Sequence, residues 1–269
     1  MTRFSYEKEL ADFQATAKWL ARRGWSEAAG GNMSMRLHAL ADLHEDDHVR
    51  LPIEVPHLAG MAILLTGSGT RAREIGENAV PHVGLYKIAD DGRHYGWIAG
   101  NQNPSMELPA HLAIHNALEA HRPEDKAILH THPVSLISLC HVPGFETGQV
   151  ISDTVLSLQS EARLILPEGI GFVPHALPGS LELGLKSAEL VTRHHLVMWQ
   201  YHGVLATGRT LAGGFDKLEV LEKSARIYWQ LRMAGIEPNG ISKDQIRHIL
   251  KSFGRLERLP DADDATGQR

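Results

Sequence analysis

The chain has 269 residues, a formal net charge of −5 at pH 7 and a hydrophobic fraction of 43%. These values are those of an ordinary globular protein with enough length for a substantial core, and they leave no electrostatic footprint for nucleic acid. One cysteine, Cys140, excludes a disulfide framework, and no apolar run reaches the length of a membrane span. We therefore expect a cytoplasmic protein that binds neither nucleic acid nor membrane.

The N-terminal region predicts a helix followed by a strand. Residues 6–23 place apolar side chains at helical spacing, and a glycine follows them. Residues 30–32, Gly-Gly-Asn, predict a tight turn with free backbone N–H groups, and residues 33–37 alternate apolar and polar side chains as a strand does. Residues 38–58 contain the acidic run 44–47 and two prolines, which predicts a long surface excursion.

The next region predicts a strand, a hairpin and a helix. Residues 62–65 are apolar and favour a strand, which leads into a glycine-containing loop at 66–70. Residues 84–88 and 95–98 favour two strands joined by an Asp-Asp-Gly turn. Residues 110–120 then favour a helix, because their apolar side chains recur at helical spacing.

Residues 127–133, Ala-Ile-Leu-His-Thr-His-Pro, favour a short buried strand that carries two histidines. Because side chains alternate across a strand, His130 and His132 share one face about 7 Å apart, whereas Thr131 points to the other. Two imidazoles so placed either converge on one metal ion or act as ordinary strand histidines with polar partners. The pair alone does not decide between these two roles.

The C-terminal half mixes helices and strands without regular alternation. We therefore predict a single α/β domain over residues 1–257 with a largely antiparallel central sheet. The polar residues 258–269 are expected to form a tail without fixed structure. The expected helices cover residues 154–160, 181–193, 214–233 and 242–253, and the expected short strands cover residues 164–166, 171–173 and 196–199.

A third histidine, His202, follows one of these buried strands and precedes a glycine, a position that commonly lies at the mouth of a pocket. Together with His130 and His132 it completes a set of three nitrogen ligands. Three protein ligands with an open fourth position are the pattern of a catalytic zinc site. The sequence therefore predicts zinc on these three side chains.

Two other histidine pairs compete for a metal. Residues 194–195 close a predicted helix and are interpreted as helix-end residues. His111 and His115 are four residues apart and share one helix face, so they too could bind a metal. They lack the adjacent acid that a metalloprotease motif requires, which makes them the weaker candidates.

Three motifs resemble those of the class II aldolase/adducin family in order and spacing. They are residues 105–111 (Ser-Met-Glu-Leu-Pro-Ala-His), residues 130–133 (His-Thr-His-Pro) and residues 202–203 (His-Gly). The resemblance extends over residues 6–235. It implies a three-layer α/β fold with helices flanking the sheet, one Zn²⁺ per subunit and a homotetramer with active sites at the subunit interfaces.

The resemblance implies an aldolase that cleaves a ketose 1-phosphate, L-rhamnulose 1-phosphate or a similar sugar, to dihydroxyacetone phosphate and L-lactaldehyde. Zinc on the three histidines would stabilise the enediolate as a Lewis acid. Glu107 would be the general base that moves the proton at the carbon beside the carbonyl. Glu161 would be a second acid or base, supplied by a neighbouring subunit. By position alone, Glu107 would instead be a solvated acid in a first helical turn.

The resemblance also implies a phosphate site made of backbone N–H groups and small hydroxyls. Each of its segments is an ordinary turn by itself, and only their order along the chain matches the family. The residues that would bind the substrate phosphate are Gly31, Asn32, Ser68, Gly69 and Ser105.

The chain departs from the family pattern at three positions around this phosphate site. A family member carries asparagine at the position of Ala29, lysine at that of Thr70 and a small hydroxyl residue at that of Met106. We expect an altered phosphate pocket, in which Arg71 and Arg73 could compensate for the missing lysine.

Other functions stay open. The same scaffold supports 4-epimerisation of pentulose phosphates, dehydration of methylthioribulose phosphate and decarboxylation of sugar-acid phosphates. The epimerases rely on an aspartate and a tyrosine that are not located in this sequence. A different class is a metal-free binding module, as adducin heads are. The presence of all three histidines and Glu107 argues against that class.

Overall fold

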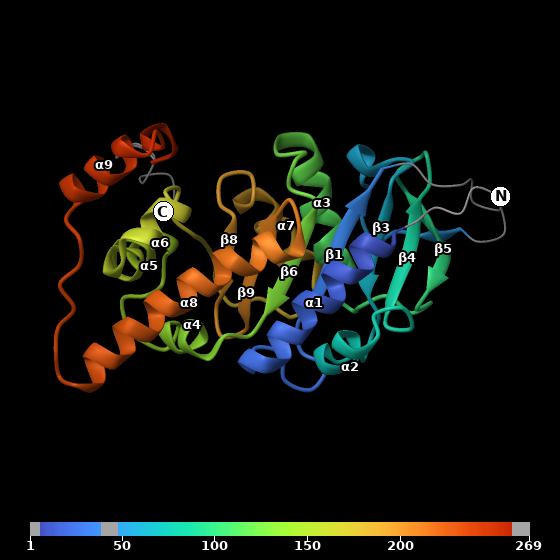
Figure 1. The fold of residues 1–269 in the computed structure, drawn as a ribbon. Helices are drawn as coiled ribbons and strands as arrows, with labels where there is room; N and C mark the ends of the chain where they lie inside the picture. The colour runs from blue at the N-terminus through green and yellow to red at the C-terminus, as the bar shows by residue number, and fades with distance from the viewer. Residues whose placement is uncertain (1–5, 39–47, 260–269) are drawn as a thin grey trace.

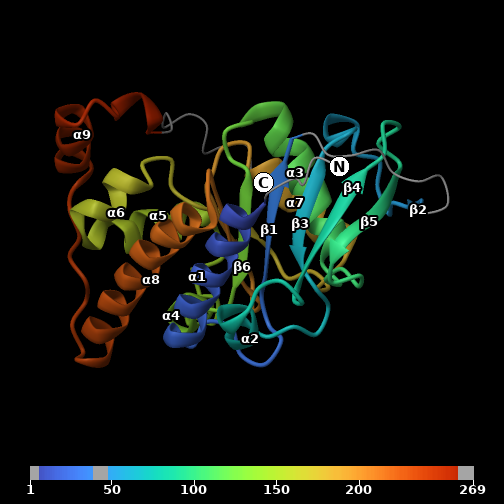
Figure 2. The same ribbon diagram turned by 45° about the vertical axis from the view of Figure 1, so that its right-hand side comes forward.

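The computed structural model describes residues 6–38 and 48–259 of the 269-residue chain. Within these residues one nine-stranded sheet has the order β2-β5-β4-β3-β1-β6-β9-β8-β7 (Figures 1 and 2). Neighbouring strands are antiparallel except β7 and β8, which are parallel. The strands are β1 (Asn32–Leu37), β2 (Val49–Arg50), β3 (Ala62–Thr66), β4 (Val83–Ile88), β5 (His94–Gly100), β6 (Ala127–Thr131), β7 (Gly171–Val173), β8 (Leu196–Trp199) and β9 (Gly203–Gly208).

Helices pack on both faces of this sheet. α1 and α8 lie on one face, and α3 and α7 lie together on the other (Figure 1). The helices are α1 (Glu7–Arg23), α2 (Ala72–Glu77), α3 (Leu108–His121), α4 (Val134–Leu139), α5 (Gly148–Val155), α6 (Ser160–Ile165), α7 (Leu181–Leu190), α8 (Leu211–Met233) and α9 (Lys243–Ser252), with short 3₁₀ turns η2 (Pro56–Leu58), η3 (Leu156–Leu158) and η4 (Leu256–Arg258).

Side-chain alternation along the central strands produces the three layers. Leu129 of β6 and Ala206 of β9 join the apolar cluster beneath α1 and α8. Their neighbours Ile128 and Leu205 join the cluster beneath α3 and α7. Both faces of the sheet are therefore buried, as alternation in a strand between two helical layers requires. The predicted three-layer α/β fold with a largely antiparallel sheet is confirmed.

The local predictions fare unevenly. The hairpin at 84–88 and 95–98 forms as β4 and β5. The strand expected at 164–166 is wrong, because this stretch forms the end of α6. This helix is anchored by Arg163, which donates to the Ser152 carbonyl at 2.7 Å. A short apolar run has no period of its own, so it does not distinguish a strand from a buried helical turn.

The excursion at 38–58 is less superficial than expected. Its acidic run at 44–47 lies outside the described residues. The part that follows buries Leu51, Val55 and Leu58 against β3 and β4. The predicted tail begins within η4, and its residues 260–269 also lie outside the described part of the chain, so the domain limits stay a prediction. None of the described helices is both long and apolar enough to cross a membrane.

Asp12 of α1 fixes the start of α8, and we expect its loss to destabilise the fold. Its carboxylate accepts from the backbone N–H groups of Leu211 at 2.8 Å and Ala212 at 3.2 Å. Asp12→Ala leaves these donors unpaired and should lower the free energy of unfolding by about 1–2 kcal/mol in denaturant titration. Asp216→Ala, an exposed change on α8, is the control and should leave the free energy of unfolding at the parent value. Equal stability of both variants would contradict this role.

Candidate metal centre

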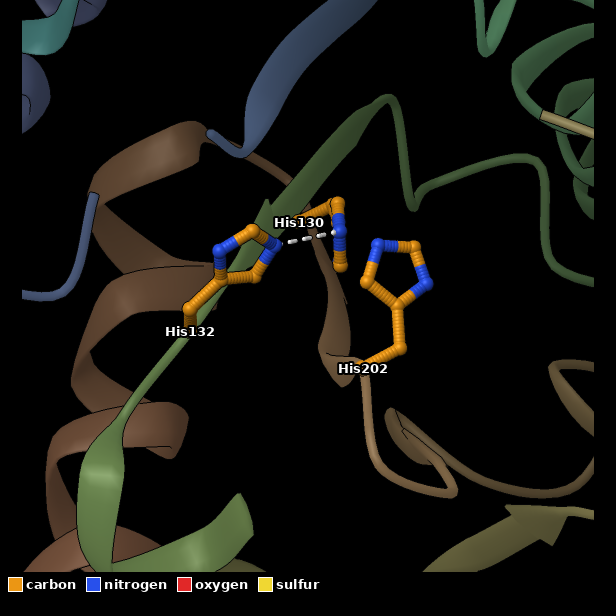
Figure 3. A group of neighbouring side chains, drawn as sticks. All are labelled: His130, His132 and His202. Atoms are coloured by element: carbon orange, nitrogen blue, oxygen red, sulfur yellow. Dashed lines mark hydrogen bonds between the residues drawn. The ribbon is translucent and has the colours of Figure 1, made fainter. Parts of the chain in front are cut away.

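Three histidines meet at one end of the central strands. His130 lies near the end of β6, His132 directly follows that strand, and His202 lies in the turn between β8 and β9. Because Thr131 pairs with Val204 across β6 and β9, the turn is held beside the end of β6. One ring nitrogen of each histidine lies within 4.8 Å of those of the others. Figure 3 shows the three rings facing a common point.

Hydrogen bonds at Nδ1 hold two of the rings, those of His130 and His132, in place. His130 Nδ1 lies 3.1 Å from the Val204 carbonyl and donates to it, which leaves Nε2 as the free lone pair. His132 Nδ1 lies 2.7 Å from Glu27 Oε1, and its Nε2 lies 3.1 Å from His130 Nε2. A ring nitrogen held by a carbonyl or a carboxylate is the usual support of a metal-binding histidine.

The electrostatic environment keeps the imidazoles of His130 and His202 neutral. Burial, then the nearby His132, lowers the pKa of His130 well below its usual value. The same two causes lower the pKa of His202 to about 4. Although burial opposes the effect, hydrogen bonds to its own backbone and to His132 hold the pKa of Glu27 below its usual value. Neutral imidazoles with outward-held Nδ1 atoms are what a metal requires.

Two glycines make room for the rings. A Cβ on Gly203 would lie 2.5 Å from the Thr131 carbonyl, 2.8 Å from a His132 ring carbon and 3.0 Å from a His130 ring carbon. A Cβ on Gly30 would lie 2.9 Å from the other side of the His132 ring. The backbone approaches the imidazoles too closely for any other residue, so glycine is required at both positions.

Backbone strain lies beside two residues of this centre. Tyr201, directly before His202, has φ of 61°, and Ala28, directly after Glu27, has φ of 48°. Non-glycine residues adopt this left-handed region at an energetic cost, which surrounding contacts have to offset. The strain therefore lies in the two turns that deliver His202 and the partner of His132.

Glu107 is the acid nearest to the histidines. It forms the N-terminal cap position of α3 and is 8% exposed. Its Oε1 lies 3.9 Å from His130 Nε2 and 3.7 Å from His202 Nε2, while its Oε2 accepts from Asn32 Nδ2 at 2.9 Å. Burial raises the pKa of the Glu107 carboxyl, against the lowering effect of the Asn32 hydrogen bond. The solvated alternative for Glu107 is therefore wrong.

The donor set fits a metal. Three imidazoles converge, the buried His202 Nδ1 points away without a partner, and the nearby Glu107 carboxylate oxygen stands outside hydrogen-bond distance of the ring nitrogens. Among the described residues the donor set contains no thiolate, since the single cysteine, Cys140, belongs to the buried apolar core. Three nitrogen ligands with room for a fourth suit a catalytic site, and Zn²⁺ is the common occupant.

The predicted phosphate-binding segments adjoin Glu107. Ser68 N donates to the Asn103 carbonyl at 2.9 Å, Ser105 N donates to the Thr66 carbonyl at 3.1 Å, and Ser105 Oγ accepts from Glu107 N at 3.2 Å. Residues 30–32 reach the same end of the sheet, because Asn32 pairs with His130. Their role in phosphate binding stays a prediction.

The side chains of these segments have partners within the chain. The two ends of the Asn32 carboxamide face Glu107 and His111, so the predicted phosphate contact of Asn32 would use its backbone. Arg71 is paired with Glu74 at 2.7 Å, so its guanidinium is engaged on α2. Met106, at the position where a family member carries a small hydroxyl residue, is 77% exposed beside Glu107.

Glu161 lies apart from the histidines in this chain. It is exposed on the first turn of α6, a helix that packs against η3, α8 and α9 (Figure 1). Sequence reasoning missed Glu27, Gly30 and Gly203, which support the rings. The two glycines flank the motif residues, but their role depends on how closely distant segments approach, which local spacing does not encode.

The chain matches a family model and curated proteins over most of its length. Residues 11–229 match the family described as Class II Aldolase and Adducin N-terminal domain. A rhamnulose-1-phosphate aldolase of Bacteroides thetaiotaomicron is 31% identical over 257 residues, which cover 91% of this chain and 94% of that protein. The rhamnulose-1-phosphate aldolase of Escherichia coli (strain K12) is 32% identical over 250 residues, which cover 89% of this chain and 90% of that protein.

Solved structures agree with these sequence matches. A sugar-phosphate aldolase from Thermotoga maritima superposes with a TM-score of 0.76 and 33% identity, over 87% of this chain and 99% of that chain. An L-fuculose 1-phosphate aldolase superposes with a TM-score of 0.64 at 19% identity, over 94% of this chain and 100% of that chain, and shares the fold.

We expect Gly203→Ala to damage metal binding more than folding. The added methyl group has to displace the rings of His130 and His132, so zinc affinity measured by chelator competition should fall about 10- to 100-fold. Gly214→Ala is the matched control, because its Cβ would meet its nearest neighbour at an ordinary 3.8 Å. A Gly203→Ala protein that binds zinc as tightly as the control would contradict the close packing described above.

Proposed function

Because the chain belongs to the class II aldolase and adducin family, we propose that it is a zinc-dependent aldolase that cleaves L-rhamnulose 1-phosphate, or a similar ketose 1-phosphate, to dihydroxyacetone phosphate and L-lactaldehyde. The chain is a lyase of the aldolase type, as its relatives over about nine-tenths of its length are named. The observation that carries the proposal is Glu107 Oε1, 3.7–3.9 Å from the nitrogens of two clustered histidines.

His130, His132 and His202 would hold the zinc, and a zinc ion bound there supplies Lewis-acid polarisation of substrate oxygens. Glu107 would move the proton. In the cleavage direction its carboxyl delivers a proton to the carbon beside the carbonyl, and in the condensation direction its carboxylate removes that proton. Burial suits both directions, because a raised pKa brings the carboxyl closer to working pH.

A neighbouring subunit would complete the site. Large apolar side chains beside the histidines are left open in the single chain: Met106 is 77%, Val134 68% and Tyr201 49% exposed. Exposed apolar groups gathered at one site favour a covered surface. The family resemblance implies that the covering subunit supplies Glu161, in a cyclic homotetramer whose interfaces contain the active sites.

Cleavage of a panel of ketose 1-phosphates tests the reaction. We expect zinc-loaded protein to release dihydroxyacetone phosphate from L-rhamnulose 1-phosphate, followed with a coupled glycerol-phosphate dehydrogenase. Protein stripped of zinc with a chelator is the control and should regain activity when zinc is returned. An epimerised, dehydrated or decarboxylated product in place of triose phosphate would instead assign one of the other reactions of this scaffold.

Complementation between two inactive variants tests the shared site. Glu107→Gln and Glu161→Gln should each lose most turnover, while Glu107→Gln should keep its zinc. In co-expressed mixed tetramers, half of the chains retain Glu107 and the other half retain Glu161. An active interface needs Glu107 from one chain and Glu161 from its neighbour, so about a quarter of the interfaces should be active. Mixed tetramers that stay as inactive as Glu107→Gln alone would show that the two glutamates do not act together across a subunit interface.

A further inference from the structure

A second set of polar side chains lies behind Glu107, buried between β1 and α3. Asn32 and Ser34 of β1 face His111 and His115 of α3, and all four are at most 9% exposed. His111 Nε2 bonds to Asn32 Oδ1, and Ser34 Oγ lies 2.6 Å from His111 Nδ1 and 2.8 Å from His115 Nε2. Asn32 Nδ2 continues the series to Glu107 Oε2 at 2.9 Å.

The chemistry of each group fixes the direction of these hydrogen bonds. The Glu107 carboxylate only accepts, so Asn32 presents its NH₂ to Glu107 and its carbonyl oxygen to His111. The carbonyl oxygen only accepts, so His111 carries its proton on Nε2 and accepts on Nδ1. Ser34 therefore donates to His111 and accepts from Nε2–H of His115. His115 Nδ1 must then be bare, and it is indeed buried without a partner.

Both histidines of this set are neutral. Burial lowers the pKa of His111 to about 3. Burial, then the nearby Arg36, lowers the pKa of His115 well below its usual value. A neutral imidazole has one donor and one acceptor, so each link has a single allowed direction. The whole series consequently ends at one determined group, the NH₂ of Asn32.

We propose that His111 is a positioning residue, which acts through Asn32 to hold Glu107 Oε2 and so leaves Oε1 beside the metal-site nitrogens to exchange the proton. The proposal rests on the proposed aldolase function. If the Asn32 carboxamide turned over, its carbonyl oxygen would face the carboxylate and repel it. His111 opposes that rotation because its Nε2–H needs the Asn32 carbonyl oxygen as acceptor.

Kinetics of His111 variants test the proposal. His111→Leu removes the donor, so kcat should fall about 10- to 100-fold with KM nearly unchanged and zinc content at the parent level. His111→Gln keeps an N–H donor at the end of a side chain of similar reach and should recover much of the lost kcat. Leu118→Ala is the control, because Leu118 is buried on α3 within the apolar cluster of Ile128 and Val197. It should lower the melting temperature without lowering kcat.

Two kinetic outcomes would overturn the proposal. One is a His111→Leu protein with the parent kcat. The other is a loss of kcat that only parallels lost stability or zinc, with no recovery in His111→Gln, because a merely structural histidine behaves in that way. The direct readout is the tautomer state in zinc-loaded protein, measured by long-range ¹⁵N–¹H correlation of labelled histidine.

The tautomer measurement separates this proposal from the proposed function. We expect His111 and His115 to be protonated on Nε2 and His130 on Nδ1. A His111 protonated on Nδ1 would overturn the positioning role even in an active aldolase. If the parent protein cleaves no ketose 1-phosphate, the proposed function fails, and the tautomers still decide whether His111 and Asn32 have the inferred arrangement.

Discussion

The side-chain spacing along α3 matches the side-chain spacing along β1, and this match fixes the geometry of the site. Four helical residues rise about 6.0 Å and two strand residues about 6.6–6.8 Å, so side chains four apart on a helix can face side chains two apart on a strand. Here Asn32, Ser34 and Arg36 face α3 and contact its polar residues in order, up to an Arg36–Glu119 pair at 2.7 Å. Because Asn32 also pairs with His130, the same register sets Glu107 against the metal centre.

A polar interface of this kind holds one arrangement more strictly than an apolar one. An apolar layer tolerates small shifts, whereas each buried polar group that loses its partner costs about 1–3 kcal/mol. A shift of β1 by one residue would turn Met33 and Met35 toward α3 and expose Asn32 and Ser34 to the opposite apolar cluster. The register that places Glu107 is therefore protected by every polar contact behind it.

The sequence predicts one half of this arrangement well. Alternation in residues 33–37 identifies a strand with an apolar and a polar face, and spacing identifies His111 and His115 as neighbours on one helix face. The three clustered histidines follow from strand alternation and a glycine turn. Local spacing gives no sign that the polar face of β1 is buried, because a solvated face and a face against a polar helix have the same pattern. The contribution of Glu27 and the close approach of Gly30 and Gly203 likewise depend on tertiary contacts.

The choice of partner for Glu107 has a chemical consequence. An arginine or lysine at the position of Asn32 would also orient the carboxylate, but its charge would lower the pKa of Glu107 and weaken it as a proton donor and acceptor. A neutral amide orients the same oxygen with a smaller electrostatic effect, and burial then raises the pKa. The Asn32 amide can rotate and exchange its donor and acceptor ends, so its orientation has to be fixed. A neutral histidine with a single N–H donor, His111, fixes that orientation. Neutral partners thus set the orientation of the Glu107 carboxylate without the loss of basicity that a charged partner would cause.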